Sequence, residues 1–443
     1  MPRPTSALVI AALFAGACTN GVPPLPDVAR AYSPPAAPDR PAECEIVPGG
    51  GSLAPVLDGA GAGSAFCLEP GEHLGPATLR EGVTVWGPRS ASIRSSGTGD
   101  TLRLIGEGSA LLGVTIDGSG HRFDLQEAAV HVVSANGARI EGVVIRNALF
   151  GIIVEKSENV LVRGNQIEGS RNAQIGLRGD AIRVWETERS RIEANRVLGS
   201  RDVVIWYSSD NRIVGNEVRG GRYGTHFMYS HRNLVARNQY VGNVVGVFAM
   251  YSRELTLENN LLAASTGAAG MGLGLKESSG VRARDNAFVK NSVGIYLDNS
   301  PYEPGTTNEF TGNAIRLCDV GVGFHSSTHH NLLIGNSLRG NAQQVRVDGG
   351  GDALGNEWKG NDFDDYAGYD LDGDGTGDVP YELRTFTGTL IARHPQLDYF
   401  RGTPALAMID AASRILPIYQ PSAILVDPSP RTGAPSPEIA RGD

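Results

Sequence analysis

The chain has 443 residues, of which 58 are glycine and 20% are charged, and its formal net charge at pH 7 is −9. This acidic balance argues against a nucleic-acid-binding protein, because such a protein needs a basic face. The many glycines favour tight turns over long helices. After residue 20 no apolar run approaches 18 residues, so the mature chain is not expected to span a membrane.

The N-terminus resembles an export signal. Arg3 precedes the apolar stretch "ALVIAALFAGA", whose last residues are small, as cleavage sites require. Residues 1–17 are therefore predicted to be a signal peptide, and cleavage leaves Cys18 first, where it could be lipidated. The site is imperfect, because Ala15 stands where such sites usually have Leu. Residues 18–43 are rich in proline and predict a semi-rigid, disordered tether.

The four cysteines fit an oxidising compartment. Cys44 and Cys67 lie on either side of the start of the folded part and could form a disulfide. Cys318 would then be unpaired, and we interpret it as a small buried residue rather than a metal ligand.

From about residue 100 the chain repeats a unit in which an apolar residue is followed by two others, Asn, one residue and a second apolar residue. The asparagines of this repeat are Asn165, Asn195, Asn216, Asn238, Asn260, Asn286, Asn313, Asn336 and Asn356. Most of their spacings lie between 20 and 23, and short alternating strands such as "DVVIWYSS" and "GIYLDNS" fill the intervals.

A period near 22 residues with strands and no helices predicts an all-β fold, a single-stranded right-handed parallel β-helix. We expect roughly ten to thirteen turns from about residue 68 to 362, within a domain over 44–362. An Asp-rich loop and a C-terminal docking tail would then occupy 363–443. Val184, Ile205 and Phe227 occupy the same position in successive repeats and are predicted to face the core, where stacked turns share one apolar interior. A leucine-rich horseshoe is excluded, because its leucine ladder and helical half are missing.

Methionine is scarce, yet Met228, Met250 and Met271 recur at intervals of 22 and 21 residues. Because successive strand side chains alternate between faces, His226, Met228 and Met250 are predicted to lie on the outer face of two neighbouring turns, beside Trp206. Two thioethers and an imidazole suit Cu(I) far better than magnesium or calcium. The sequence therefore predicts a copper site at these residues, with Met271 and Trp206 as further candidates. If the register were off by one residue, the methionines would fill the core instead.

The stretch "YDLDGDGTGD" resembles a calcium loop. Its candidate ligands occupy positions 1, 3, 5, 7 and 9 of such a loop, and they are Asp370, Asp372, Asp374, Thr376 and Asp378. Tyr381 stands where the bidentate Glu is expected. An acidic, solvated turn is the alternative.

Further along, "PALAMIDAASRILP" predicts a short amphipathic helix. Its apolar face would fold back on the β-helix or dock onto a partner. The residues of that face are Leu406, Ile409, Ala412, and Ile415 or Leu416.

Two other function classes fit this fold. Parallel β-helices host carbohydrate lyases, hydrolases and epimerases, which use carboxylates ~5 to 9.5 Å apart across a sugar. The candidates here are Glu155, Asp180, Arg183 and Glu186. They form no repeated acidic groove, so an enzyme is the weaker alternative. A surface scaffold or adhesin would leave the regular methionines unexplained.

The chain resembles the NosD family of periplasmic β-helix proteins of the carbohydrate-binding/sugar-hydrolase (CASH) repeat type. The resemblance runs from about residue 106 to 427, and its most specific segments are "RYGTHFMYSHRN", "GVFAMYSRE", "GMGLGLKE", "GIYLDNSP", "DYAGYDLDGDGTGDVPY" and "LVDPSP". The resemblance implies delivery of copper to the copper-sulfur centre of nitrous oxide reductase. It also implies an ABC transporter, made of an ATPase and a permease, and a small lipoprotein chaperone that donates the copper. The membrane would be reached only through the lipid anchor or the docking tail.

Overall fold

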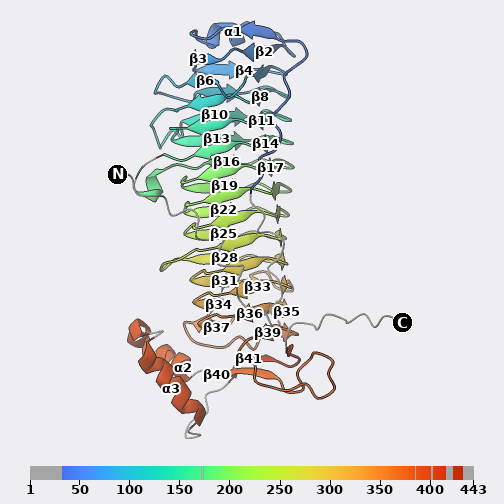
Figure 1. The fold of residues 1–443 in the computed structure, drawn as a ribbon, viewed down its shortest axis with the longest axis vertical. Helices are drawn as coiled ribbons and strands as arrows, with labels where there is room; N and C mark the ends of the chain where they lie inside the picture. The colour runs from blue at the N-terminus through green and yellow to red at the C-terminus, as the bar shows by residue number, and fades with distance from the viewer. Residues whose placement is uncertain are drawn as a thin grey trace, which may run out of the picture.

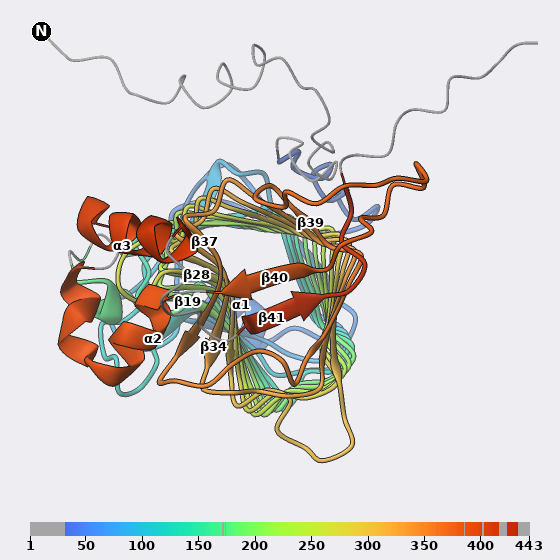
Figure 2. The ribbon, with the colours of Figure 1, turned by 90° about the horizontal axis from the view of Figure 1, so that it is seen from below.

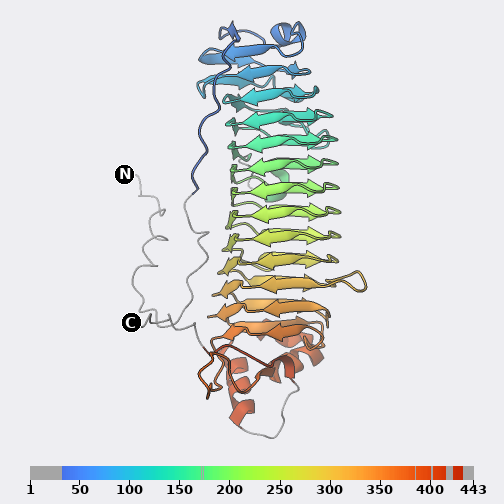
Figure 3. The ribbon, with the colours of Figure 1, turned by 90° about the vertical axis from the view of Figure 1, so that its right-hand side faces the viewer.

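The computed structural model describes residues 32–432, apart from residues 171, 173, 385, 401–402 and 416–422. Three parallel sheets wind around one long axis and form a β-helix of about 14 turns (Figures 1 and 3). The predicted right-handed parallel β-helix is confirmed. The predicted signal peptide and Cys18 lie outside the described residues.

Each turn contributes one short strand to each sheet. The 14 strands of sheet A are β1 (Glu45–Val47), β2 (Ala65–Leu68), β5 (Thr84–Trp86), β8 (Ala110–Leu112), β11 (Arg139–Glu141), β14 (Leu161–Arg163), β17 (Arg191–Glu193), β20 (Arg212–Val214), β23 (Leu234–Ala236), β26 (Thr256–Glu258), β29 (Arg282–Arg284), β32 (Asn308–Thr311), β35 (Asn331–Ile334) and β38 (Glu357–Lys359). The 13 strands of sheet B are β3 (Gly71–Leu74), β6 (Ala91–Arg94), β9 (Thr115–Asp117), β12 (Val144–Arg146), β15 (Gln166–Glu168), β18 (Arg196–Leu198), β21 (Glu217–Arg219), β24 (Gln239–Val241), β27 (Leu261–Ala263), β30 (Ala287–Val289), β33 (Ala314–Arg316), β36 (Ser337–Arg339) and β39 (Asp362–Phe363). The 12 strands of sheet C are β4 (Ala77–Leu79), β7 (Leu102–Leu104), β10 (Ala128–Val133), β13 (Phe150–Glu155), β16 (Ile182–Trp185), β19 (Asp202–Trp206), β22 (Tyr223–Met228), β25 (Val245–Met250), β28 (Met271–Lys276), β31 (Val293–Asp298), β34 (Val320–His325) and β37 (Gln343–Asp348).

The turns of the β-helix begin at Glu45, earlier than the predicted start near residue 68. Strand β1 starts at Glu45, and the short helix α1 (Ala54–Asp58) covers the N-terminal end with Leu53 and Leu57 buried. The turn estimate was too low because the first turns lack the Asn repeat and use other turn residues. A disulfide joins Cys44 to Cys67 and holds the first two strands of sheet A together.

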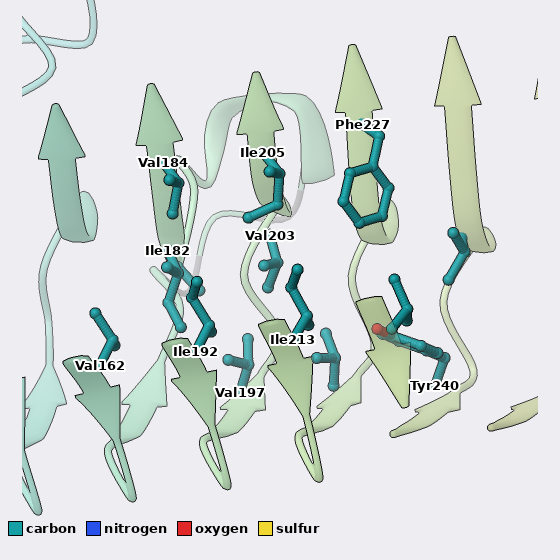
Figure 4. Packing of buried hydrophobic residues seen from close by; sticks show 14 of the residues in the cluster. Val162, Ile182, Val184, Ile192, Val197, Val203, Ile205, Ile213, Phe227 and Tyr240 are labelled. Atoms are coloured by element: carbon teal, nitrogen blue, oxygen red, sulfur yellow. The ribbon is translucent and has the colours of Figure 1, made fainter. Parts of the chain in front are cut away.

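One apolar core fills the interior of the β-helix. Val184, Ile205 and Phe227 are at most 1% exposed and point inward from neighbouring strands of sheet C (Figure 4). The predicted inward column is therefore confirmed, and the register of the outer face follows from it.

A ladder of buried asparagines lines one corner of the β-helix. Each amide Nδ2 donates to the Oδ1 of the next asparagine, and that same Oδ1 accepts the backbone N–H of the asparagine before it. The ladder runs through Asn165, Asn195, Asn216, Asn238, Asn260, Asn286, Asn313, Asn336 and Asn361.

The last asparagine of this ladder is Asn361, so the prediction that Asn356 occupies the same position of the repeat was wrong. Asn356 instead ends a second, shorter ladder with Asn308 and Asn331. The buried carboxylate of Asp427 accepts from both the backbone and the side chain of Asn361, and it thereby ends the long ladder.

The C-terminal part closes the end of the β-helix. The antiparallel strands β40 (Tyr381–Arg384) and β41 (Ala423–Asp427) cross its opening (Figure 2). Helices α2 (Phe386–Arg393) and α3 (Pro404–Ile415), with η4 (Pro395–Phe400) between them, lie on the sheet C side. The predicted helix exists as α3, but its expected face is only partly covered: Leu406 is buried, whereas Ile409 and Ala412 are exposed. No helix among the described residues has the length and apolar character needed to cross a bilayer.

Residues 32–43, called the strap below, pack along the β-helix, so the prediction of a disordered tether does not hold for them. Every third residue is half-buried and the two between are exposed, which is the three-residue period of polyproline II. Three residues of a polyproline II helix span ~9.3 Å, which is close to the ~9.6 Å across two turns of the β-helix. Each half-buried residue of the strap therefore lies about two turns from the next. Tyr32 donates its hydroxyl hydrogen to the Ala194 carbonyl (2.8 Å), and the Trp86 indole donates to the Pro38 carbonyl (3.1 Å).

Glycines make room for the strap. A Cβ at Gly142 would lie 2.7 Å from Pro38, and one at Gly164 would lie 2.5 Å from Pro35. Both glycines have positive φ, as does Gly215, which lies beyond the strap with open space around it.

Gly164→Ala should release the strap. Gly215→Ala is the matched control. Alanine at either position must adopt a φ near +66°, which costs a similar ~1–2 kcal/mol, but only Gly164 faces a proline. We expect chymotrypsin to cleave after Tyr32 faster in Gly164→Ala than in Gly215→Ala, as read by mass spectrometry. Equal cleavage rates in the two variants would contradict this account of the glycine column.

Candidate metal site on the outer face of sheet C

The candidate copper ligands lie on the outer face of sheet C. The strand register places Trp185, Trp206, Met228 and Met250 side by side on β16, β19, β22 and β25. The four side chains are half-exposed. The predicted outward direction of Met228 and Met250 is confirmed, and neighbouring strands bring their backbones within ~4.8 Å of each other.

His226 lies on the same face but is more deeply covered than expected. It was predicted to be exposed or half-exposed, and its exposed fraction is 6%. Aromatic rings on three neighbouring strands surround its imidazole: Trp206 lies at 5.4 Å between ring centroids, Tyr223 at 4.7 Å and Phe248 at 6.0 Å. The outer face therefore has its own small buried layer around this histidine.

The two ring nitrogens of His226 have different surroundings. Nδ1 accepts a hydrogen bond from the indole Nε1–H of Trp206 at 3.3 Å. Nε2 is buried and has no hydrogen-bond partner among the described residues. Burial is the main cause that lowers the pKa of His226 to about 4; Arg222 and Arg201 act in the same direction, and Asp202 opposes them. The imidazole is therefore neutral near pH 7, which is the form that binds metal ions.

Met271 lies on the outer face but at the other end of its strand. It pairs in register with Val245, whereas the position opposite Met250 is Lys276. Its sulfur lies over Gly274, because a Cβ at that glycine would be 2.7 Å from Met271 Sδ and 2.4 Å from the Phe248 ring. The register does not bring Met271 beside the other two methionines.

A row of stacked tyrosines borders the site, and sequence reasoning missed it. Tyr207, Tyr229 and Tyr251 follow Trp206, Met228 and Met250 directly, and their rings stack at 5.4 and 4.9 Å. All three have positive φ, because the strand ends there in a corner. The same 22-residue period that revealed the methionines could have revealed these tyrosines.

A buried charge cluster lies at the starts of β16, β19 and β22. Arg201 donates to both carboxylate oxygens of Asp180 (2.9 and 3.0 Å), and Arg222 forms a second two-point pair with Asp202. Burial raises the pKa of Asp180 to about 6, despite the opposing effect of Arg201. Arg183 is only 7% exposed, and its guanidinium lies 5.0 Å from the Trp206 ring.

This cluster weakens the carbohydrate-enzyme alternative. Asp180 has no exposed surface on its side chain and is committed to Arg201, so it cannot approach a sugar. Glu155 faces His131 at 3.5 Å, and Glu186 is exposed at a corner with positive φ. A catalytic pair needs two carboxyl groups that both reach the substrate, and the buried Asp180 does not supply one.

In the Asp-rich loop, Asp370, Asp372 and Asp374 each offer a carboxylate oxygen within 4.8 Å of the others. Asp378 was expected to converge with them but does not belong to this group; its carboxylate accepts the backbone N–H of Leu371 (2.7 Å). Tyr381, at the position of the missing Glu, is buried against Phe363 with the two rings 3.9 Å apart.

Cys318 is buried, and burial raises the pKa of its thiol to about 11. It offers no thiolate ligand near pH 7.

These features define a class of protein: a parallel β-helix with thioether, imidazole and aromatic side chains gathered on the outer face of one sheet. Residues 172–368 match the family described as "Periplasmic copper-binding protein (NosD)". Two proteins named "Probable ABC transporter binding protein NosD" are similar over most of the chain. The one from Pseudomonas aeruginosa is 28% identical, with 80% of this chain and 85% of the relative covered. The one from Stutzerimonas stutzeri is 25% identical, with 79% and 83% covered.

The chain is therefore similar to proteins of the NosD family, in the matched region and over most of its length. Among solved structures, the catalytic unit of an α-1,3-glucanase from Streptomyces thermodiastaticus has a similar fold, with a TM-score of 0.50 and 14% identity over 73% of this chain and 70% of that chain. At this identity the likeness concerns the fold alone.

Proposed function

We propose that this protein binds copper in the periplasm as Cu(I), at His226, Met228 and Met250, and hands it on as cargo. The observation that carries the proposal is the strand register, which puts both thioethers on adjacent strands of one outer face with a buried, unpartnered imidazole nitrogen two residues away. The destination we propose is the copper-sulfur centre of nitrous oxide reductase. The family description as periplasmic and copper-binding supports this function.

The ligand chemistry suits a protein that must release its metal. Thioethers are soft donors that favour Cu(I), and they hold it without the strength of thiolates. The imidazole adds one nitrogen ligand, and because the ring is already neutral, copper binding releases no net proton. Because the site is on an outer face, a donor and an acceptor could approach it in turn without opening the core.

The proposed partners are an ABC transporter, with its permease and ATPase, a copper-donor chaperone, and nitrous oxide reductase. The names of the two relatives support a transporter partner. We propose that the C-terminal tail makes that contact, because Met408 and Ile409 on α3 and Phe400 before it are exposed. Lipidation of Cys18 would add a membrane anchor.

The copper site is tested by changing both Met228 and Met250 to Leu. The change keeps size and hydrophobicity, so it should cost less than ~1.5 kcal/mol per site in stability. Cu(I) affinity, titrated against a competing chelator, should fall at least ~tenfold, equivalent to about 1.4 kcal/mol. Met408→Leu is the matched control, because Met408 is 71% exposed on α3, and it should leave the affinity unchanged.

If the double Leu variant binds Cu(I) as tightly as the parent, the site lies elsewhere. The next candidates are His325, His329 and His330. His325 is exposed at the end of β34, and its strand register places it between Asp298 and Asp348.

We also propose that the Asp-rich loop binds Ca²⁺ in a structural role. Convergent carboxylates in a glycine-rich loop suit a hard cation, and the loop adjoins the segment that closes the β-helix, since Thr432 donates to Asp370 (3.3 Å).

Calcium should slow hydrogen exchange in residues 366–381, and the variant with both Asp370→Asn and Asp374→Asn should lose this protection. At a calcium concentration 100 times Kd, the protection should correspond to about 2.7 kcal/mol. Asp319→Asn, which removes an acidic side chain far from the loop in sequence, is the control. Identical exchange with and without calcium would refute the site.

A further inference from the structure

We propose that Trp206 is a latch on the copper site: its indole N–H holds His226 in a tautomer that blocks Nε2, and copper loading breaks this hydrogen bond. The inference rests on the proposed function, because it concerns access to the same imidazole. It assigns Trp206 the role of a positioning residue that opposes metal entry.

The tautomer follows from which groups can donate. An indole nitrogen is a donor only, so Nδ1 of His226 must be the acceptor of the 3.3 Å bond from Trp206. A neutral imidazole carries one proton, which must then sit on Nε2. Nε2 is the nitrogen that is buried without a partner. The resting site therefore holds a proton where a metal would need a lone pair.

Metal binding must break the Trp206 bond by either of two routes. If Cu(I) binds Nε2, that nitrogen gives up its proton and Nδ1 takes one, so the ring stays neutral and Nδ1 can no longer accept from the indole. If Cu(I) binds Nδ1, it takes the lone pair that the indole N–H occupies. No net proton is released in the first route and none moves in the second.

The surroundings of Trp206 hold the latch in place. The indole meets the imidazole edge-on, with an angle of 86° between the rings. The Arg183 guanidinium lies 5.0 Å from the centroid of the indole. Arg183 is itself held near Asp180 in the buried charge cluster. Trp206 remains half-exposed, so its side chain has solvent on one side when it leaves the imidazole.

The same contacts argue against a direct role of the indole face in holding copper. A cation binds an indole through the negative face of the ring, and the Arg183 cation already lies over this ring. A cuprous ion stacked on Trp206 would have to share the ring with that charge. The edge of the indole, with its N–H, is the part that reaches the histidine.

The proton position can be measured without copper. We expect the ¹⁵N chemical shifts of His226 in the metal-free protein to report the Nε2–H tautomer. In Trp206→Phe, which keeps an aromatic ring but removes the donor, a mixture of tautomers should appear. Trp185→Phe is the matched control, because it keeps an aromatic ring beside Trp206 and because, among the described residues, the Trp185 indole makes no hydrogen bond to the histidine. It should leave the shifts unchanged. An Nδ1–H tautomer in the parent protein would overturn the latch whatever copper does.

Cu(I) affinity then separates the latch from the site itself. Trp206→Phe should bind Cu(I) about five-fold more tightly than the parent, equivalent to about 1 kcal/mol, which is the net worth of one hydrogen bond. Trp185→Phe should bind like the parent. Equal or weaker binding by Trp206→Phe overturns the latch while leaving the copper site standing. If His226→Ala binds Cu(I) as tightly as the parent, the proposed site is wrong at this histidine, and the latch falls with it.

Discussion

The fixed register between neighbouring turns is the constraint on which the rest of the structure depends. The backbone hydrogen bonds of three parallel sheets set the spacing, and the buried Asn ladder holds each turn over the next. Each asparagine side chain accepts the backbone N–H of the preceding asparagine and donates to a backbone carbonyl of the preceding turn. Removing one would therefore leave several buried polar groups without partners. Because of this register, residues about 22 positions apart become direct neighbours, and any side chain that recurs at that interval forms a continuous row.

The outer face of sheet C shows what such rows can build. In its middle turns the row consists of indoles and thioethers, and a row of stacked tyrosines follows at the corner. At the starts of the same strands lies a second buried layer of paired Arg and Asp side chains. The Arg201 guanidinium carbon there lies 4.9 Å from the centroid of the Phe123 ring. His226 sits where the aromatic and charged regions meet. Its burial keeps it neutral, and its hydrogen bond from Trp206 decides which ring nitrogen carries the proton.

Much of the fold followed from the repeat, because a regular period fixes both the turn length and the face of each strand residue. Phe227 inward and Met228 outward were predicted correctly on that basis. The burial of His226 could not be predicted, because Trp206, Tyr223 and Phe248 cover it from three different strands and their ring positions are not encoded in a spacing. The packing of the strap against the β-helix was missed for a similar reason. Its proline content indicates a stiff chain, but the surface on which it packs is a column of glycines that forms only when the turns stack. Asn361 was missed because the Asn356 unit also fits the repeat, and only the structure separates the two ladders.

X-ray absorption at the copper edge of the Cu(I)-loaded, exported protein tests the central claim most directly. The account predicts a cuprous ion with two sulfur ligands and one imidazole nitrogen, and loss of the sulfur contribution when Met228 and Met250 are both Leu. A copper ion with only nitrogen and oxygen ligands, or a sulfur contribution that persists in the double Leu variant, would contradict it.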